Sequence, residues 1–233
     1  MKRLVHGAAT MLAIALIPQL ASAQDTEKSI AVKGGVEVKG WMGKVDDKEA
    51  KAGLTENDAK FFAMGKDLHA TTGPAITYWN PSMQGKGDYV VKATFTEREY
   101  MGLNNHPHPY GLVMAGNDMG TPTASYLYCA AYGNGNFIVR GFGPAPFQMN
   151  GPRGGADPAV SKAEAKGKPV TQEIAMAVKG DKVSCSINGK EVASYSKSEV
   201  IGAGKLKSTD GVVGVRMGHN TDAHIAGFSL GKP

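Results

Sequence analysis

The chain has 233 residues, a net charge of +5, 42% apolar residues and 20% charged residues. This balance is ordinary for a folded protein, and it excludes a disordered tail, a coiled coil and a multi-pass membrane protein. The 31 Gly and 12 Pro predict many turns, while two Cys are too few for a disulfide-dense miniprotein. The length allows one large domain or two small ones.

The first residues have the pattern of a secretion signal. Lys2 and Arg3 precede an apolar stretch over residues 8–18 that is too short to span a bilayer, and small residues at 21–23 suit a signal peptidase. We therefore expect a signal peptide over residues 1–23, a periplasmic or extracellular protein, and no membrane insertion after cleavage.

The charge of the remaining chain does not indicate a nucleic-acid partner. Removing residues 1–23 takes away Lys2 and Arg3 but no acidic residue, which lowers the net charge to +3. The other lysines are spread along the chain without a basic run or interleaved aromatic residues. Nucleic-acid binding needs a concentrated positive surface, so we expect no nucleic-acid partner.

The chain divides into an expected N-terminal extension over residues 24–64 and a single domain over residues 65–233. In the extension, Thr55 and the acidic residues after it match a weak helix start, which predicts one short helix. In the domain, apolar residues alternate along Tyr89–Glu97. This alternation predicts a strand with one buried face.

Short apolar runs then recur at regular spacing, with turn residues between them. Asn and Gly residues separate several of the runs and favour tight hairpins. The predicted strands are Tyr110–Ala115, Ser125–Tyr132, Phe137–Phe142, Glu173–Val178, Lys182–Ile187, Val212–Met217 and His224–Leu230. Because no helical pattern repeats between them, the sequence predicts an all-β fold, a two-sheet antiparallel β-sandwich or jelly roll with a short N-terminal helical segment.

These strand and turn motifs carry a family resemblance. They are Gly87–Val91, Lys179–Val183 leading into Ile187–Lys190, and the closing Asp210–Arg216 followed by His224–Phe228. Over residues 65–230 the chain resembles the concanavalin A-like lectin/glucanase jelly rolls, which include laminin-G-type modules and 3-keto-disaccharide hydrolases. The resemblance implies an architecture more than an activity, since one fold hosts many functions.

The chain departs from the related glucanases in its acidic residues. Those enzymes resemble one another in a strand that carries Glu-x-Asp-x-x-Glu, and this chain has no such run. Glu97 and Glu99 have the parity to share a strand face, but a solvated strand end is the favoured interpretation. We therefore assign no catalytic residue, and the absence of the acidic motif favours a protein without enzymatic activity.

Cys129 and Cys185 both fall in predicted strands. An exported chain keeps disulfides, so one bridge between them is the simplest hypothesis. The alternative is two separately buried thiols that act as small apolar residues.

Four of the six histidines fall in two close pairs. His106 and His108 alternate with prolines, while His219 and His224 bracket a turn and could face each other, with Asp222 as a further ligand. Such pairs suit Zn²⁺ or Cu²⁺, and hydrogen-bonded surface histidines are the alternative. We expect no cofactor, with Zn²⁺ or Ca²⁺ as the open possibilities. The Ca²⁺ candidates are the turn residues Asn117, Asp118, Asp210, Asn220 and Asp222.

One predicted strand has a tyrosine-rich side. Tyr126, Tyr128 and Tyr132 share a face, and Leu127 and Cys129 lie on the other. The tyrosines suit either an exposed sugar-binding platform or packing beneath the long loop over residues 143–168. The predicted ligand-binding residues are Trp79, His106, His108, Tyr126, Tyr128, Arg140, His219 and His224.

Together these patterns predict an exported, non-catalytic binding module for carbohydrate or glycan-like ligands. One alternative is a sugar-active hydrolase or lyase whose His, Tyr and Arg residues transfer protons. Another is a protein–protein adhesion module.

Overall fold

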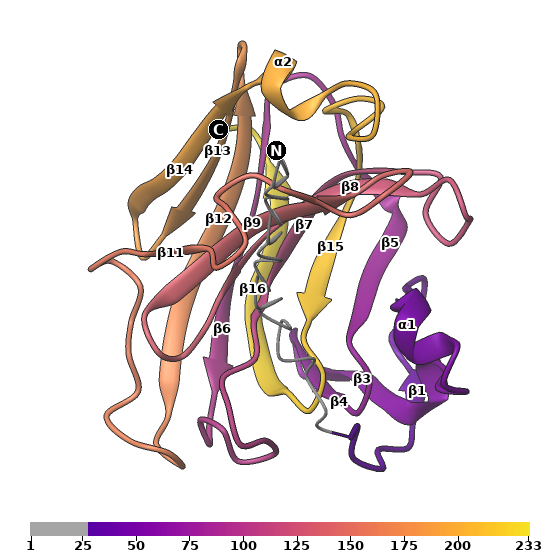
Figure 1. Ribbon diagram of the computed structural model, residues 1–233, viewed down its shortest axis with the longest axis vertical. Coiled ribbons are helices and arrows are strands. Elements are labelled where there is room, and N and C mark those ends of the chain that lie inside the picture. The colour runs from indigo at the N-terminus through magenta and orange to yellow at the C-terminus, as the bar shows by residue number, and fades with distance from the viewer. Residues whose placement is uncertain (1–27) are drawn as a thin grey trace, which may run out of the picture.

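The computed structural model describes residues 28–233, so the predicted signal peptide lies outside the described residues. The described chain forms a sandwich of two sheets (Figure 1). Sheet A contains, in spatial order, β1 (Gly35–Val36), β3 (Ala59–Met64), β4 (Asp67–Thr72), β16 (Asp222–Gly231), β6 (Tyr89–Glu97), β12 (Val170–Lys179), β13 (Lys182–Ile187) and β14 (Lys190–Ser196).

Sheet B contains, in spatial order, β10 (Phe147–Gln148), β9 (Asn136–Phe142), β8 (Ser125–Ala131), β7 (Tyr110–Asn117), β15 (Gly211–Met217), β5 (Ile76–Gly85) and β2 (Met42–Val45), and β11 (Gly155–Ala156) also pairs with β9. The helices are α1 (Asp47–Ala50), α2 (Lys197–Val200) and a 3-10 turn over Glu56–Asp58. Apart from the parallel β1–β3 pair, the strands of both sheets pair antiparallel. The all-β sandwich prediction is confirmed.

Alternation of side chains builds the core between the sheets. On β6, Tyr89, Val91, Ala93 and Phe95 are at most 3% exposed and face sheet B's inner side chains. The residues between them are half-buried or exposed. Each sheet has an apolar inner face. When the two faces pack together, their apolar surface is removed from water, and this burial stabilises the sandwich.

The N-terminal part of the described chain belongs to both sheets. β2 forms an edge of sheet B, and β1 and β3 form an edge of sheet A. These strands therefore extend the sandwich into the segment that the sequence assigned to an extension. The predicted helix start at Thr55 caps only a 3-10 turn, because Ala59 already has an extended backbone and begins β3. Buried and less buried residues alternate only over the first part of β3, so the sequence pattern does not predict this strand.

A disulfide joins Cys129 on β8 to Cys185 on β13. The two strands lie in different sheets, and both residues are almost fully buried. The bridge therefore ties sheet A to sheet B through the core.

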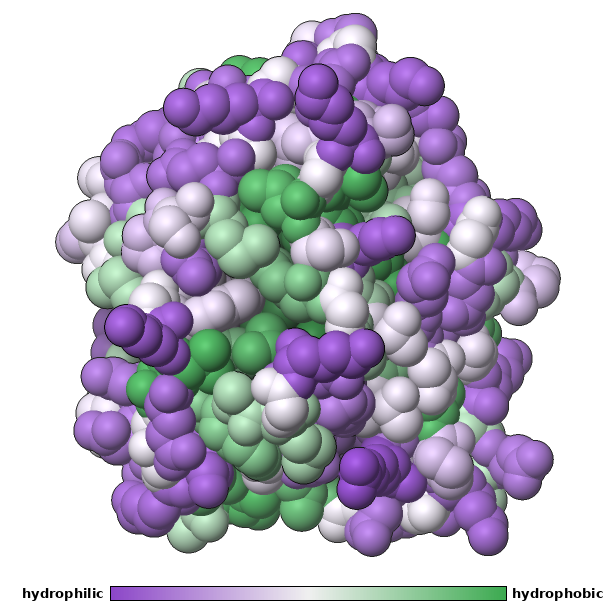
Figure 2. All heavy atoms as spheres, turned by 180° about the vertical axis from the view of Figure 1, so that it is seen from behind, coloured by the Kyte–Doolittle hydropathy of each residue, from purple (hydrophilic) through white to green (hydrophobic). Residues whose placement is uncertain are grey.

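The surface is mixed in character. Figure 2 shows one face on which apolar side chains gather in a central hollow and hydrophilic side chains cover the rim. Within residues 28–233, no helix is long and apolar enough to cross a membrane.

Candidate functional site

The outward face of sheet B carries the aromatic residues of β8. Tyr126 and Tyr128 point outward, while Leu127 and Cys129, which alternate with them along the strand, point into the core. This is the parity that the sequence predicts. However, Tyr126 and Tyr128 are only 7% and 6% exposed. They are not an open platform but the floor of a recessed surface.

Phe142 on β9 completes the aromatic cluster. Its ring centroid lies 5.0 Å from that of Tyr126 and 6.2 Å from that of Tyr128. The guanidinium of Arg216 lies 5.6 Å from the ring centroids of both Tyr128 and Phe142. Phe142 is half-buried and therefore offers part of its ring to solvent.

Arg216 is a functional candidate that the sequence prediction missed. It projects outward from β15 because Val215 and Met217 on either side point into the core. Its Nη1 donates to Asp46 Oδ1 at 2.6 Å and its Nη2 to Asp46 Oδ2 at 2.5 Å. Nη1 also donates to Thr77 Oγ1 at 3.2 Å. A single Arg inside an apolar strand is the signal in the sequence, whereas nothing there points to Asp46.

The electrostatics keep this cluster in defined protonation states. Burial disfavours the charged guanidinium, but attraction by Asp46 outweighs it, and the pKa of Arg216 is raised. Burial also raises the pKa values of the Tyr126 and Tyr128 phenols. Both phenols are therefore neutral at physiological pH and act as hydrogen-bonding groups. The Tyr126 hydroxyl lies 3.0 Å from Thr77 Oγ1.

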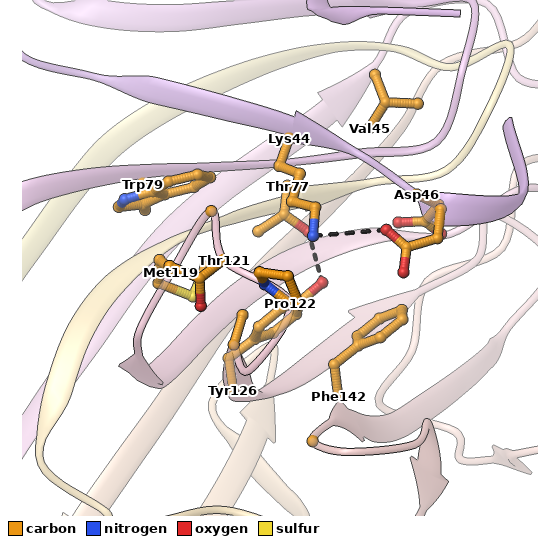
Figure 3. Close-up of a pocket in the computed structure, with 14 residues that line it drawn as sticks. Lys44, Val45, Asp46, Thr77, Trp79, Met119, Thr121, Pro122, Tyr126 and Phe142 are labelled. Atoms are coloured by element: carbon orange, nitrogen blue, oxygen red, sulfur yellow. Dashed lines mark hydrogen bonds and ion pairs between the residues drawn. The ribbon is translucent and has the colours of Figure 1, made fainter. Parts of the chain in front are cut away.

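Two neighbouring pockets open on this face. The first, which we call the Trp79 pocket, encloses about 70 Å³ and is shown in Figure 3. Trp79 lies at one end, Tyr126 and Phe142 form its floor, and the side chain of Lys44 reaches over it. The Lys44 ammonium lies 3.4 Å from a carboxylate oxygen of Asp47.

The second pocket, which we call the Arg140 pocket, encloses about 330 Å³. It shares Asp46 and Phe142 with the Trp79 pocket, so the two are adjacent. Half-buried Arg140 donates from Nη2 to the Pro152 carbonyl at 2.8 Å. The other lining side chains include Tyr128, Tyr132, Ile138, Phe147, Gln148, Arg216, His108 and His219.

The long loop over residues 143–168 covers this face only in part. Its first residues, which include Pro146, Phe147 and Gln148, line the Arg140 pocket. The later residues continue past the edge of sheet B, where β11 pairs with β9 and the Ala163 amide donates to the Gly133 carbonyl, and Asp157 reaches Lys190 of sheet A. The start of the loop therefore borders the tyrosines, but the loop as a whole does not cover them.

Three of the predicted histidines come together at the end of the Arg140 pocket. The His108 and His219 ring centroids lie 3.9 Å apart, and that of His106 lies 4.3 Å from His108. The expectation that His219 and His224 face each other is wrong. His224 lies on β16 in sheet A, where Ala223 and Ile225 take the inward positions. Its Nε2 lies 3.3 Å from Asp67 Oδ2.

The turn residues considered for Ca²⁺ have structural partners in different places. Asp222 accepts from Thr71 Oγ1 at 2.6 Å, and Asp118 pairs with Lys207. Asn220 holds the start of the described chain by accepting from the Ile30 amide at 2.8 Å. Among residues 28–233, one group of potential metal ligands lies close together, and it consists of His106, His108 and His219.

Glu97 departs from the expected solvated strand end. It is 7% exposed, and its Oε1 accepts from the Met101 amide at 2.9 Å. Burial, with a smaller contribution from Asp222, raises the pKa of Glu97 to about 7. Glu97, exposed Glu99 and Asp222 line a separate pocket of about 290 Å³.

The two-sheet antiparallel sandwich shares its fold with solved jelly-roll structures, which confirms the fold resemblance. A protein of unknown function with a galectin-like fold from Bacillus subtilis matches with a TM-score of 0.57 and 16% identity, over 88% of this chain and 97% of that one. The carbohydrate-binding module CBM66 from Bacillus subtilis matches with a TM-score of 0.50 and 10% identity, over 85% and 99%. No protein-family model and no curated protein sequence matches the chain.

Proposed function

We propose that the chain is an exported, non-catalytic module that binds a carbohydrate or glycan-like ligand in the two pockets on sheet B. The observation that carries this proposal is the aromatic floor of Tyr126, Tyr128 and Phe142 beside the Arg216–Asp46 pair. Sugars offer apolar C–H faces and rings of hydroxyl groups. A surface that binds them needs aromatic faces together with planar hydrogen-bonding groups.

The parts of the site differ in their accessibility to a ligand. Phe142 and Arg140 are half-buried, and the side chain of Asp46 is 25% exposed. These groups can contact a ligand directly, while the nearly buried tyrosines hold Phe142 and Arg216 in place. The Arg140 pocket lies at the lower end of the volumes of small-molecule sites and suits one or two sugar rings.

The fold supports the same class of function. A carbohydrate-binding module shares this architecture, although a shared fold alone does not assign a ligand. Export, expected from the first 23 residues, would place the module where it can meet glycans outside the cytoplasm.

A glycan array tests this proposal. Wild type should bind at least one glycan class, and Phe142→Ala and Arg140→Ala should each lose at least about tenfold in affinity, a typical cost for one anchoring contact. Tyr195→Ala is the control, because Tyr195 lies on β14 of sheet A. No glycan binding by a folded wild type would contradict the proposal and favour an adhesion module.

A second candidate is a sugar-active hydrolase centred on Glu97. A buried carboxyl with a pKa of about 7 can act as a general acid, and Asp222 lines the same pocket. Polysaccharide and 3-keto-sugar pools, assayed for new reducing ends or unsaturated products, test this activity. Turnover that Glu97→Gln abolishes would establish it, and no turnover by wild type would exclude these substrates.

A further inference from the structure

The structure assigns a Zn²⁺-type metal site to His106, His108 and His219. One nitrogen from each imidazole lies within 4.8 Å of the other two. The nitrogen ligands of one tetrahedral Zn²⁺ stand about 3.3 Å apart, given Zn–N bonds of about 2.0–2.1 Å. Small rotations of the imidazole rings therefore close the three nitrogens around one ion.

Hydrogen bonds between two distant segments bring the three histidines together. The Gly218 amide donates to the Pro109 carbonyl at 2.7 Å, and Asn104 Nδ2 donates to the Asn220 carbonyl at 2.8 Å. A Cβ on Gly218 would lie 2.9 Å from Pro109 Cδ and 3.0 Å from His108 Cβ. Glycine at this position thus allows the His-Pro-His segment to reach the end of β15. The site is held by the fold and not by one flexible loop.

Oxygen atoms beside two of the rings favour the tautomer that binds metal. His219 Nδ1 lies 3.4 Å from Glu49 Oε1, and His106 Nδ1 lies 2.6 Å from Asn105 Oδ1. A hydrogen on Nδ1 directed at such an oxygen makes Nε2 the nitrogen that carries the lone pair. Glu49 is itself fixed, because its Oε2 accepts from the Ala75 amide at 2.7 Å. A carboxylate behind a ligating histidine is a recurrent arrangement at zinc sites.

The metal site borders the Arg140 pocket, since His108 and His219 line both. Tetrahedral Zn²⁺ with three protein ligands keeps a fourth position for water or another ligand. The inference does not depend on the proposed glycan binding, because metal uptake is measured without any glycan.

Zinc titration of the chain, produced without a histidine tag and stripped with EDTA, tests the site. Calorimetry and elemental analysis should give one Zn²⁺ per chain. His106→Ala, His108→Ala and His219→Ala should each weaken binding by at least about tenfold, and Glu49→Gln should weaken it by about 10–100-fold as a positioning residue. His224→Ala is the matched control and should bind like wild type, because His224 lies on the outer face of sheet A.

Two further measurements separate loss of the site from loss of the fold. Each metal-free variant should show the cooperative melting of the wild type, and Zn²⁺ should raise the melting temperature of wild type but not of His219→Ala. Co²⁺ should give the visible absorption of a tetrahedral site in wild type only. Failure of wild type to take up Zn²⁺, or equal affinity in folded His219→Ala and His224→Ala, would overturn the assignment.

Discussion

Arg216 and Asp46 form a bidentate ion pair between residues that are 170 positions apart in the chain. Arg216 lies on β15 in the middle of sheet B, and Asp46 follows the edge strand β2. The pair joins the N-terminal segment to the floor of both pockets. It therefore serves the stability of the fold as well as the shape of the site.

Asp46→Ala should lower the free energy of unfolding by about 3–5 kcal/mol, because it leaves the Arg216 guanidinium buried without its counter-charge. The Arg216 side chain is only 8% exposed, so water replaces the lost partner poorly. Urea unfolding measures the change. Asp47→Ala is the control, because Asp47 is 79% exposed and pairs with Lys44 at the surface, a contact worth about 0–1 kcal/mol. Equal effects of the two substitutions would contradict this account.

Removal of the disulfide should destabilise the sandwich without changing its architecture. The bridge closes a loop with a sequence separation of 56 residues, and in the chain-entropy model this stabilises the folded state by about 4 kcal/mol. The Cys129→Ala/Cys185→Ala double variant should therefore unfold at lower urea concentration than the oxidised wild type. Wild type kept reduced should behave like the variant. A wild type whose unfolding midpoint does not respond to reduction would show that the bridge contributes nothing.

Glu97 should make stability depend on pH in a defined direction. Its pKa is about 7 in the folded protein and 4.5 in its ordinary state. Between these values the folded protein holds a proton that the unfolded chain releases, so the free energy of unfolding falls as pH rises. The loss reaches about 3 kcal/mol by pH 8, at 1.36 kcal/mol for each unit of pKa difference.

Glu97→Gln isolates this contribution, because an amide can still accept from the Met101 amide but does not titrate. The variant should be more stable than wild type at pH 8, with the difference shrinking toward pH 4.5. Urea denaturation at several pH values measures it. The same pH slope in wild type and variant would assign the effect to other groups.

The sequence predicts those parts of the fold in which a short-range pattern is strong. The alternation along Tyr89–Glu97 predicts β6 with the bounds that the structure shows. The parity of Tyr126 and Tyr128 places both on the strand face opposite to that of Cys129. The Asn188-Gly189 hairpin has the positive φ values that such a turn requires. Each of these features depends only on neighbouring residues.

The site depends on contacts that a local pattern does not encode. β2 is four residues long and lacks alternation, so nothing in the sequence brings Asp46 to Arg216. His219 and His224 are close in sequence but the turn between them passes from sheet B to sheet A. On β16, Ala223 and Ile225 take the inward positions, so His224 points to the outer surface of sheet A. His219 stays near His106.

The two tryptophans provide the most direct test of ligand binding on sheet B. Trp79 lines the Trp79 pocket, whereas Trp41 packs against Phe61 and Phe228 and lines a different pocket beside sheet A. In ¹H–¹⁵N spectra, each indole N–H gives one signal. Titration with a glycan that the array identifies should shift the Trp79 indole signal and leave the Trp41 signal unchanged. A shift of Trp41 with no change at Trp79 would place the ligand elsewhere and contradict the account.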